Sequence, residues 1–434
     1  MDTTDLAVID ELVTDRRDRH LSLLAAGMER SVTDLDTFQE WVTTTLREAA
    51  VDVESFRLAP ADVTDQPAYQ RTIQTTPDAL RTGPNIIGSR EADIDGPSTL
   101  LFAHADTNPI TNEQADDNPA FQTQDDRLIG PGIADDISGV TAILSAIELV
   151  DTSELRFEGE LLVGSVLGKQ LGVLGTYGLV TQYGPTDTAI YVHPAETQAG
   201  LNELKIGSNG ICEFTIRVEG KPPETTEPMH TVFRASAVNP IEKAARIQDA
   251  LLKWADTASE EYAYPPLVEL ADRSVSIMIG DVDVAAGKSV YSVPQSCTLH
   301  GTVCFPPTAD LQSMQAAVRG TVEDTFSDDE WLGASTVELD WGDHMAESTA
   351  TPPDSPFLER TATAVDRFAD RWPTHYYGHT ASDIRYPLLY WDADTVGFGP
   401  QAGNMGSPAE WIDTAEYLDT IATIAAQIGT VEDG

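Results

Sequence analysis

The sequence predicts an α/β protein of two domains, in which helices flank a mostly parallel sheet. The chain has 434 residues, more than one ordinary hydrophobic core accommodates. Between residues 98 and 206, apolar strand-like runs alternate with helical patterns, which is typical of a parallel sheet covered on both faces. From residue 207 the pattern changes to strict alternation of apolar and polar residues, which indicates antiparallel strands with one solvated face.

The elements of the first domain follow in order. Residues 5–50 predict two amphipathic helices, the second beginning near Asp34. Beyond them we expect strands at 98–107, 157–168 and 187–196, a helix at 138–150 and a Gly-rich helix after residue 170. Parallel strands end at one edge of their sheet, so the loops that follow them should lie close together.

An inserted α+β domain is expected at 207–310, between two parts of the first domain at 1–206 and 311–434. The insertion should contain strands at 210–220, 274–287 and 296–305 and a helix at 238–255. The returning chain should contribute helices near 310–326, 355–370 and 412–428 and a strand at 335–342.

The charge of the chain restricts its surroundings and its partners. Asp and Glu number 71 against 26 Lys and Arg, a formal net charge of −45. Self-repulsion on this scale is tolerated when salt screens it, so we expect a halophilic protein from a high-salt cytoplasm. An acidic mesophilic protein is the alternative, although the acidic residues are spread along the whole chain. Nucleic acid and anionic membranes are not expected as partners.

The cysteines and the N-terminus agree with a cytoplasmic location. Three cysteines are too few for a disulfide framework. The N-terminal residues are acidic and amphipathic, without the basic start and apolar run of a signal peptide. No apolar run approaches the roughly 20 residues of a membrane-spanning helix.

Four short stretches at the expected strand ends carry the candidate chemistry. They are His104-Ala-Asp106, the glycine-rich stretch ending in Asp135, residues 168–172, and His193-Pro194. Two imidazoles and a carboxylate could bind zinc. Asp106, without binding the metal itself, could then hold the His104 imidazole in one tautomer. The alternative for each histidine is a purely structural role at a strand end.

In their order and spacing these stretches resemble metallopeptidase family twenty, which includes aminoacylase, acetylornithine deacetylase, succinyl-diaminopimelate desuccinylase, glutamate carboxypeptidase and peptidase T. The resemblance covers nearly the whole chain. Further matching stretches are Asn209-Gly210, Asn239-Pro240-Ile241, Ser382-Asp383-Ile384-Arg385 and Phe398-Gly399-Pro400. It implies a zinc-exopeptidase-like sheet with an inserted ferredoxin-like lid or dimerisation domain, a homodimer, and acyl-amino acid or peptide substrates.

The resemblance also implies which metal ligands are present and which are lost. The family holds two zinc ions bridged by an aspartate, which matches Asp135. One ion would use His104 and His193, and this set is intact. The other would use the positions of Gln170 and Gly406, which are degenerate, so at most one zinc ion per chain is expected.

The remaining site residues follow from the same resemblance. Lys169 stands at the position of the family's general base, and a protonated lysine cannot accept a proton. His230 of the insertion would stabilise an oxyanion. Asn239 and Arg385 would lie on the substrate side, while Cys304 replaces an expected arginine.

Two functions therefore stay open at the level of the sequence. One is a metal-dependent amidohydrolase or peptidase with a single metal ion, assisted by Lys169 or by a carboxylate such as Glu196 or Asp136. The other is a non-catalytic pseudoenzyme that keeps the fold as a binding or regulatory module.

Overall fold

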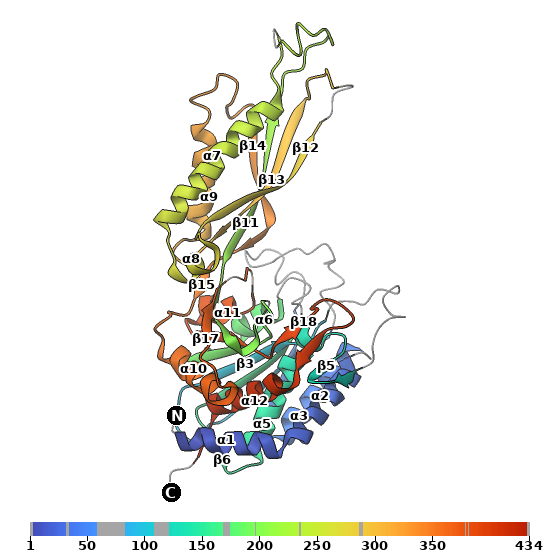
Figure 1. Ribbon diagram of the computed structural model, residues 1–434, viewed down its shortest axis with the longest axis vertical. Coiled ribbons are helices and arrows are strands. Elements are labelled where there is room, and N and C mark those ends of the chain that lie inside the picture. The colour runs from blue at the N-terminus through green and yellow to red at the C-terminus, as the bar shows by residue number, and fades with distance from the viewer. Residues whose placement is uncertain are drawn as a thin grey trace. The chain divides into compact units, whose positions relative to one another are not determined.

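The computed structural model describes two compact units of the chain (Figure 1). The described residues are 3–31, 34–58, 83–107, 121–167, 174–195, 197–233, 236–285, 290–377, 379–380 and 382–431. The first unit is Met1–Gly207 with Ala350–Gly434, and the second is Ser208–Thr349. Two short strands, β10 (Gly207–Ser208) and β15 (Thr349–Ala350), lie where the chain passes from one unit to the other.

Eight strands of the described residues form the large sheet of the first unit, in the order β1-β2-β7-β3-β8-β17-β9-β16. The four central strands β7, β3, β8 and β17 run parallel to one another. The strands are β1 (Asp52–Phe56), β2 (Asn85–Arg90), β3 (Thr99–His104), β7 (Leu161–Val166), β8 (Thr188–Val192), β9 (Glu203–Lys205), β16 (Thr374–Tyr376) and β17 (Asp394–Phe398). The predicted mostly parallel sheet flanked by helices is confirmed.

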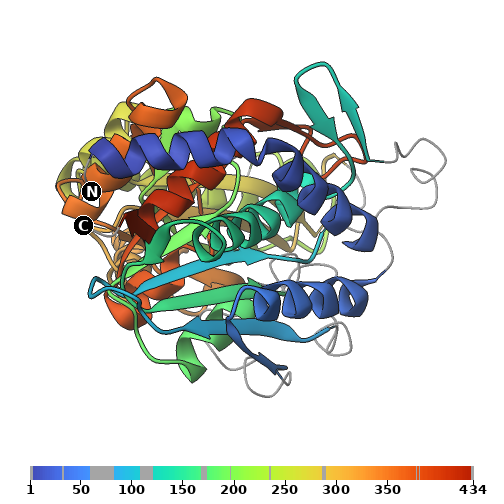
Figure 2. The same ribbon diagram turned by 90° about the horizontal axis from the view of Figure 1, so that it is seen from below.

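Helices cover both faces of this sheet (Figure 2). The face that carries α5 and α12 also receives the N-terminal helices, whereas α6 and α11 pack together on the other face. Because both faces are covered, every residue of β3 and of β8 is buried, which explains their uninterrupted apolar runs. The helices are α1 (Thr3–Asp15), α2 (Arg17–Ser31), α3 (Leu35–Glu48), α5 (Ser138–Asp151), α6 (Leu174–Gln182), α10 (Pro356–Ala369), α11 (Arg385–Trp391) and α12 (Thr414–Ile428).

The N-terminal region contains three helices where two were predicted. The chain turns at Arg16 between α1 and α2, a point without Gly, Pro or a capping side chain. Charged residues continue across the turn, so the sequence carries no signal for it. The start of α3 was predicted correctly, because the carboxylate of Asp34 accepts a hydrogen bond from the Thr37 amide at 2.7 Å.

The second unit has a four-stranded antiparallel sheet, in the order β12-β13-β11-β14. Its elements are β11 (Gly210–Glu219), α7 (Pro240–Glu261), α8 (Pro265–Ala271), β12 (Ser276–Val284), β13 (Ser296–Phe305), α9 (Leu311–Asp324) and β14 (Val337–Ala346). Apart from the short α8, this is the β-α-β-β-α-β order of a ferredoxin-like unit. The helices α7 and α9 cover one face of the sheet and build its core.

The second unit extends further along the chain than the predicted boundary at residue 310. Helix α9 contributes Met314 and Val318 to the core of this unit, and β14 pairs antiparallel with β11. The sequence pattern alone predicts both elements as part of the returning first domain. A helix followed by a strand looks the same in both domains, and only the pairing of β14 identifies its sheet.

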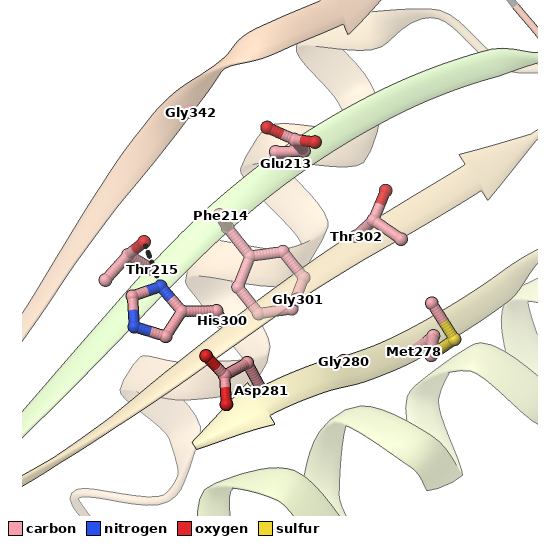
Figure 3. Close-up of a pocket in the computed structure, with 10 residues that line it drawn as sticks. All are labelled: Glu213, Phe214, Thr215, Met278, Gly280, Asp281, His300, Gly301, Thr302 and Gly342. Carbon is pink, nitrogen blue, oxygen red and sulfur yellow. Dashed lines mark hydrogen bonds between the residues drawn. The ribbon is translucent and has the colours of Figure 1, made fainter. Parts of the chain in front are cut away.

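The other face of this sheet is open and contains a shallow hollow of about 330 Å³ (Figure 3). His300 lies on its wall and contacts the hydroxyl of Thr215 at 3.3 Å. Gly280 and Gly342 line it without side chains. No group of three potential metal ligands occurs among these lining residues.

Two small sheets complete the first unit. One has the order β18-β19-β5-β4, and the other pairs β20 with β6. Their strands are β4 (Gln122–Gln124), β5 (Arg127–Ile129), β18 (Ala402–Gly403), β19 (Trp411–Asp413), β6 (Leu155–Phe157) and β20 (Gly429–Val431). The pairing of β19 with β5 brings the C-terminal segment next to the loop that carries Asp135. Among the described residues, no helix is long and apolar enough to cross a membrane.

Candidate metal centre

His104 ends strand β3 and is completely buried. Its Nδ1 lies 2.9 Å from the backbone oxygen of Asp106, while the carboxylate of Asp106 is more distant, at 3.7 Å. We expected that carboxylate to hold the imidazole. The closer contact comes instead from the main chain, because the backbone turns back after the strand.

Asp135 and His193 meet His104 at the carboxyl ends of the parallel strands. Asp135 lies in η3 (Ile133–Ile137), a short turn before α5, and His193 directly follows β8. The Oδ1 atom of Asp135 is 2.9 Å from Nε2 of His104 and 3.3 Å from Nε2 of His193. One ligand atom from each residue lies within 4.8 Å of the other two.

The tautomer of both histidines follows from their backbone contacts. Nδ1 of His193 lies 2.6 Å from the carbonyl oxygen of Pro194, and Nδ1 of His104 lies 2.9 Å from that of Asp106. A carbonyl oxygen only accepts hydrogen bonds, so each Nδ1 carries the proton. In the neutral rings, both Nε2 lone pairs then point at the Asp135 carboxylate. Three electron-rich atoms at this separation require a positive charge between them.

The protonation equilibria of the site show the same requirement. Burial disfavours charge on His104, yet the nearby Asp135 carboxylate raises the pKa of this histidine to about 9. Burial likewise opposes ionisation of Asp135, but the two histidines hold its pKa well below the ordinary value. The site thus attracts a cation strongly. Two imidazole nitrogens and one carboxylate oxygen are a ligand set that fits Zn²⁺.

Glu410 is a site residue that the sequence did not single out. Its buried carboxylate accepts hydrogen bonds from the amides of Ala134 and Asp135 through Oε2, at 3.0 and 3.1 Å. Its Oε1 accepts from the amide of Gly406 at 2.8 Å. Burial, and then the charge of Asp135, raise the pKa of Glu410 to about 7. Glu410 therefore fixes the loop that presents Asp135.

Gly406 lies in a left-handed turn, with φ +76°. A residue with a β-carbon is strained in this conformation. The backbone here accordingly suits glycine, and the position offers no metal-binding side chain. Its amide is used by Glu410 instead.

The other predicted site residues fall in different places. Lys169 and Gln170 lie outside the described residues, as does Glu196. Asp136 is fully buried and accepts a hydrogen bond from the Gly139 amide at 3.1 Å, so it caps the start of α5. Arg385, at the start of α11, is 1% exposed and donates to the Tyr386 hydroxyl at 3.1 Å.

Two predicted residues belong to the second unit. His230 is exposed and its Nδ1 lies 3.1 Å from the Ser236 hydroxyl. The side chain of Asn239 accepts from the Ile241 amide at 3.1 Å and is the N-cap of α7. Their roles toward a substrate stay predictions.

A mostly parallel α/β unit with two histidines and an aspartate at its strand ends, together with a ferredoxin-like insertion, is the architecture of a metallohydrolase. The family model described as Peptidase family M20/M25/M40 matches residues 100–429. The chain belongs to this family.

Two curated relatives align with part of the chain. This chain is 20% identical over 313 residues to N-formyl-4-amino-5-aminomethyl-2-methylpyrimidine deformylase of Bacillus subtilis (strain 168). The alignment covers 70% of this chain and 66% of that protein. The chain is 31% identical over 143 residues to carboxypeptidase G2 of Pseudomonas sp. (strain RS-16), covering 33% of each. The chain thus aligns with less than two thirds of the length of these relatives.

Solved structures share the fold at low sequence identity. The aminopeptidase PepT from Bacillus cereus ATCC 10987 has a TM-score of 0.70 at 15% identity, covering 94% of this chain and 98% of that one. Human carnosine dipeptidase 1 has a TM-score of 0.62 at 12% identity, covering 97% of each chain. The likeness therefore extends over both units.

Proposed function

We propose that this chain binds one zinc ion between His104, Asp135 and His193 and hydrolyses the amide bond of an N-acyl amino acid or a short peptide. The observation that carries the proposal is the convergence of two imidazole Nε2 atoms on one carboxylate oxygen. The names of the two curated relatives, a deformylase and a carboxypeptidase, support amide cleavage as the reaction class.

The residues of the chain have distinct tasks in this reaction. A bound zinc ion would supply Lewis acidity toward the scissile carbonyl. The carbonyl oxygens of Asp106 and Pro194 hold a proton on each Nδ1, so that Nε2 is the ligand nitrogen of both neutral rings. Glu410 holds the Asp135 loop through its backbone amides. By resemblance to the family, oxyanion stabilisation falls to His230 of the second unit, while Asn239 and Arg385 would lie on the substrate side.

The identity of residue 169 favours a second candidate function. A lysine at the position of the general base removes assistance that is commonly worth about 10²–10⁴-fold in rate. Gly406 occupies a turn without a ligand side chain, so a second metal ion has no support on that side. The second candidate is a pseudoenzyme that binds metal and ligand without turnover.

Elemental analysis separates these functions. The protein is purified in molar salt without chelator, as wild type, His193→Ala and the control His300→Ala, whose half-buried histidine belongs to the second unit. We expect about one zinc ion per chain in wild type and control, and none in His193→Ala. Absence of metal from the wild type would overturn the proposal.

A substrate panel of N-acyl amino acids and dipeptides then tests turnover with the same three proteins. Hydrolysis that disappears only in His193→Ala supports the enzyme. A metal-loaded wild type that binds panel members without cleaving them is the result expected of the pseudoenzyme.

We further propose a homodimer in a high-salt cytoplasm. The net charge of −45 supports the high-salt environment, and the ferredoxin-like second unit supports dimerisation through the family resemblance. Light scattering in molar salt should give twice the chain mass of 46.9 kDa. A monomer at all concentrations would contradict the dimer.

A further inference from the structure

A row of three residues crosses the large sheet beside the candidate metal centre. Gly397 of β17 is the register partner of Lys205 of β9 and of Tyr191 of β8. Residues opposite one another on neighbouring strands project to the same face of a sheet. Lys205, Gly397 and Tyr191 therefore share one face.

The glycine leaves room for the lysine side chain to cross the middle strand. A β-carbon at Gly397 would lie 3.1 Å from Cβ and 3.4 Å from Cδ of Lys205. The lysine stem thus passes over the glycine, and Nζ lies 5.5 Å from the centroid of the Tyr191 ring. This is the geometry of a cation–π contact.

The burial of Lys205 is unusual. It is one of six lysines in the chain and is only 3% exposed, whereas lysine is almost never fully buried without compensating contacts. The ammonium group lies at the end of a row that leads through the Tyr191 ring to the candidate metal ligand His193.

The Tyr191 ring connects the lysine to a metal ligand. It stacks on the imidazole of His193, with centroids 5.1 Å apart and planes inclined by 24°. It also stacks on Phe102, with centroids 5.0 Å apart. The ring is completely buried, and it contacts the imidazole whose Nε2 faces Asp135.

We propose that Lys205 and Tyr191 are positioning residues for the metal centre, and this inference rests on the proposed metal binding. The Pro194 carbonyl fixes one edge of the His193 imidazole, and the Tyr191 ring fixes its plane. Lys205 holds the tyrosine ring by lying over it, and Gly397 makes this path possible. Contacts behind a ligand of this kind typically change metal affinity by about 10–100-fold.

The test measures Co²⁺ affinity by chelator competition, together with the visible absorption of the bound ion, in Lys205→Met, Tyr191→Leu and Gly397→Ala. Lys253→Met is the matched control, because Lys253 is exposed and its loss changes the net charge equally. We expect the Kd for Co²⁺ to rise about tenfold in the first two variants and less in Gly397→Ala. The visible absorption bands of the bound Co²⁺ should change in the same variants. The Kd and the bands of Lys253→Met should equal those of the wild type.

A conservative variant separates positioning from stability. Tyr191→Phe keeps the ring and should retain the wild-type Kd and bands, while Tyr191→Leu should not. Melting temperatures of the metal-free variants show how much is lost through folding alone. Unchanged Kd and bands in Lys205→Met and Tyr191→Leu would overturn the inference.

A metal-free measurement distinguishes failure of this inference from failure of the proposed function. If the wild type binds no Co²⁺, the proposed metal binding is refuted. The imidazole ¹H and ¹⁵N NMR shifts of His193 in metal-free protein then report on the stack. They should move in Lys205→Met but not in Lys253→Met, and unmoved shifts would refute the positioning role.

Discussion

The substitution Asp419→Asn should stabilise the protein at neutral and alkaline pH but hardly at pH 4. Asp419 is partly buried on α12. Burial, followed by the charge of Glu416, raises the pKa of Asp419 to about 7. The neighbouring guanidinium of Arg371 compensates only in part, because it is bound to Glu416 at 2.8 Å.

The direction of the effect follows from proton binding. Between about pH 4 and pH 7 the unfolded chain loses the proton of Asp419 while the folded chain keeps it. The unfolded state then binds fewer protons, so stability falls as the pH rises through this range and is constant above it. A difference of about three pKa units corresponds to at most ~4 kcal/mol. Salt screens the repulsion between Asp419 and Glu416, so we expect Asp419→Asn to raise the free energy of unfolding at neutral pH by roughly 2–4 kcal/mol.

The assay is urea unfolding at constant molar salt, between pH 4 and pH 8, for wild type, Asp419→Asn and the control Asp366→Asn. Asp366 is an exposed residue of α10, so its substitution makes the same change in net charge. The stability of Asp419→Asn relative to wild type should increase with pH, and that of Asp366→Asn should stay level. Parallel curves for wild type and Asp419→Asn would refute the reasoning.

Three further substitutions test other features of the fold. Burial lowers the pKa of His20 to about 4, so the wild-type protein loses stability as the pH falls from 6.5 toward 4. His20→Leu lacks this loss, so its melting temperature relative to wild type should be higher at pH 5 than at pH 7. An equal difference in melting temperature at both pH values would contradict this. Asp329→Asn should lower the free energy of urea unfolding of the second unit by roughly 3 kcal/mol, because the buried carboxylate binds both Arg246, at 2.5 Å, and Lys243. A loss below about 1 kcal/mol would show that solvent replaces the carboxylate. Gly406→Ala should cost about 1–2 kcal/mol through its positive φ, whereas Gly184→Ala, where nothing lies within 4 Å, should be neutral in the same assay.

The sequence was sufficient to predict the strands that carry the metal ligands. The runs that became β3 and β8 are apolar on both faces because helices cover both sides of the sheet. Strand β13 was bounded correctly at both ends, since its alternation ends sharply at Pro306. His104, Asp135 and His193 could be grouped because parallel strands end at one edge.

The contacts that fix the site could not be predicted, because they join distant parts of the chain. Glu410 binds amides 275 and 276 residues away, and nothing in its immediate sequence indicates those partners. The path of Lys205 depends on Gly397, which becomes its neighbour only through the pairing of β9 with β17. The assignment of α9 and β14 to the second unit likewise depended on the pairing of β14 with β11.

The carbonyl oxygens that set the histidine tautomers belong to the main chain. No side-chain substitution removes a carbonyl group, so the donor state of both imidazoles is inherited with the path of the backbone. A substitution of either histidine removes an imidazole, but it leaves these carbonyl oxygens in place while the strands hold their register. A histidine restored at either position would therefore meet the same acceptor for its Nδ1 proton and return in the same tautomer.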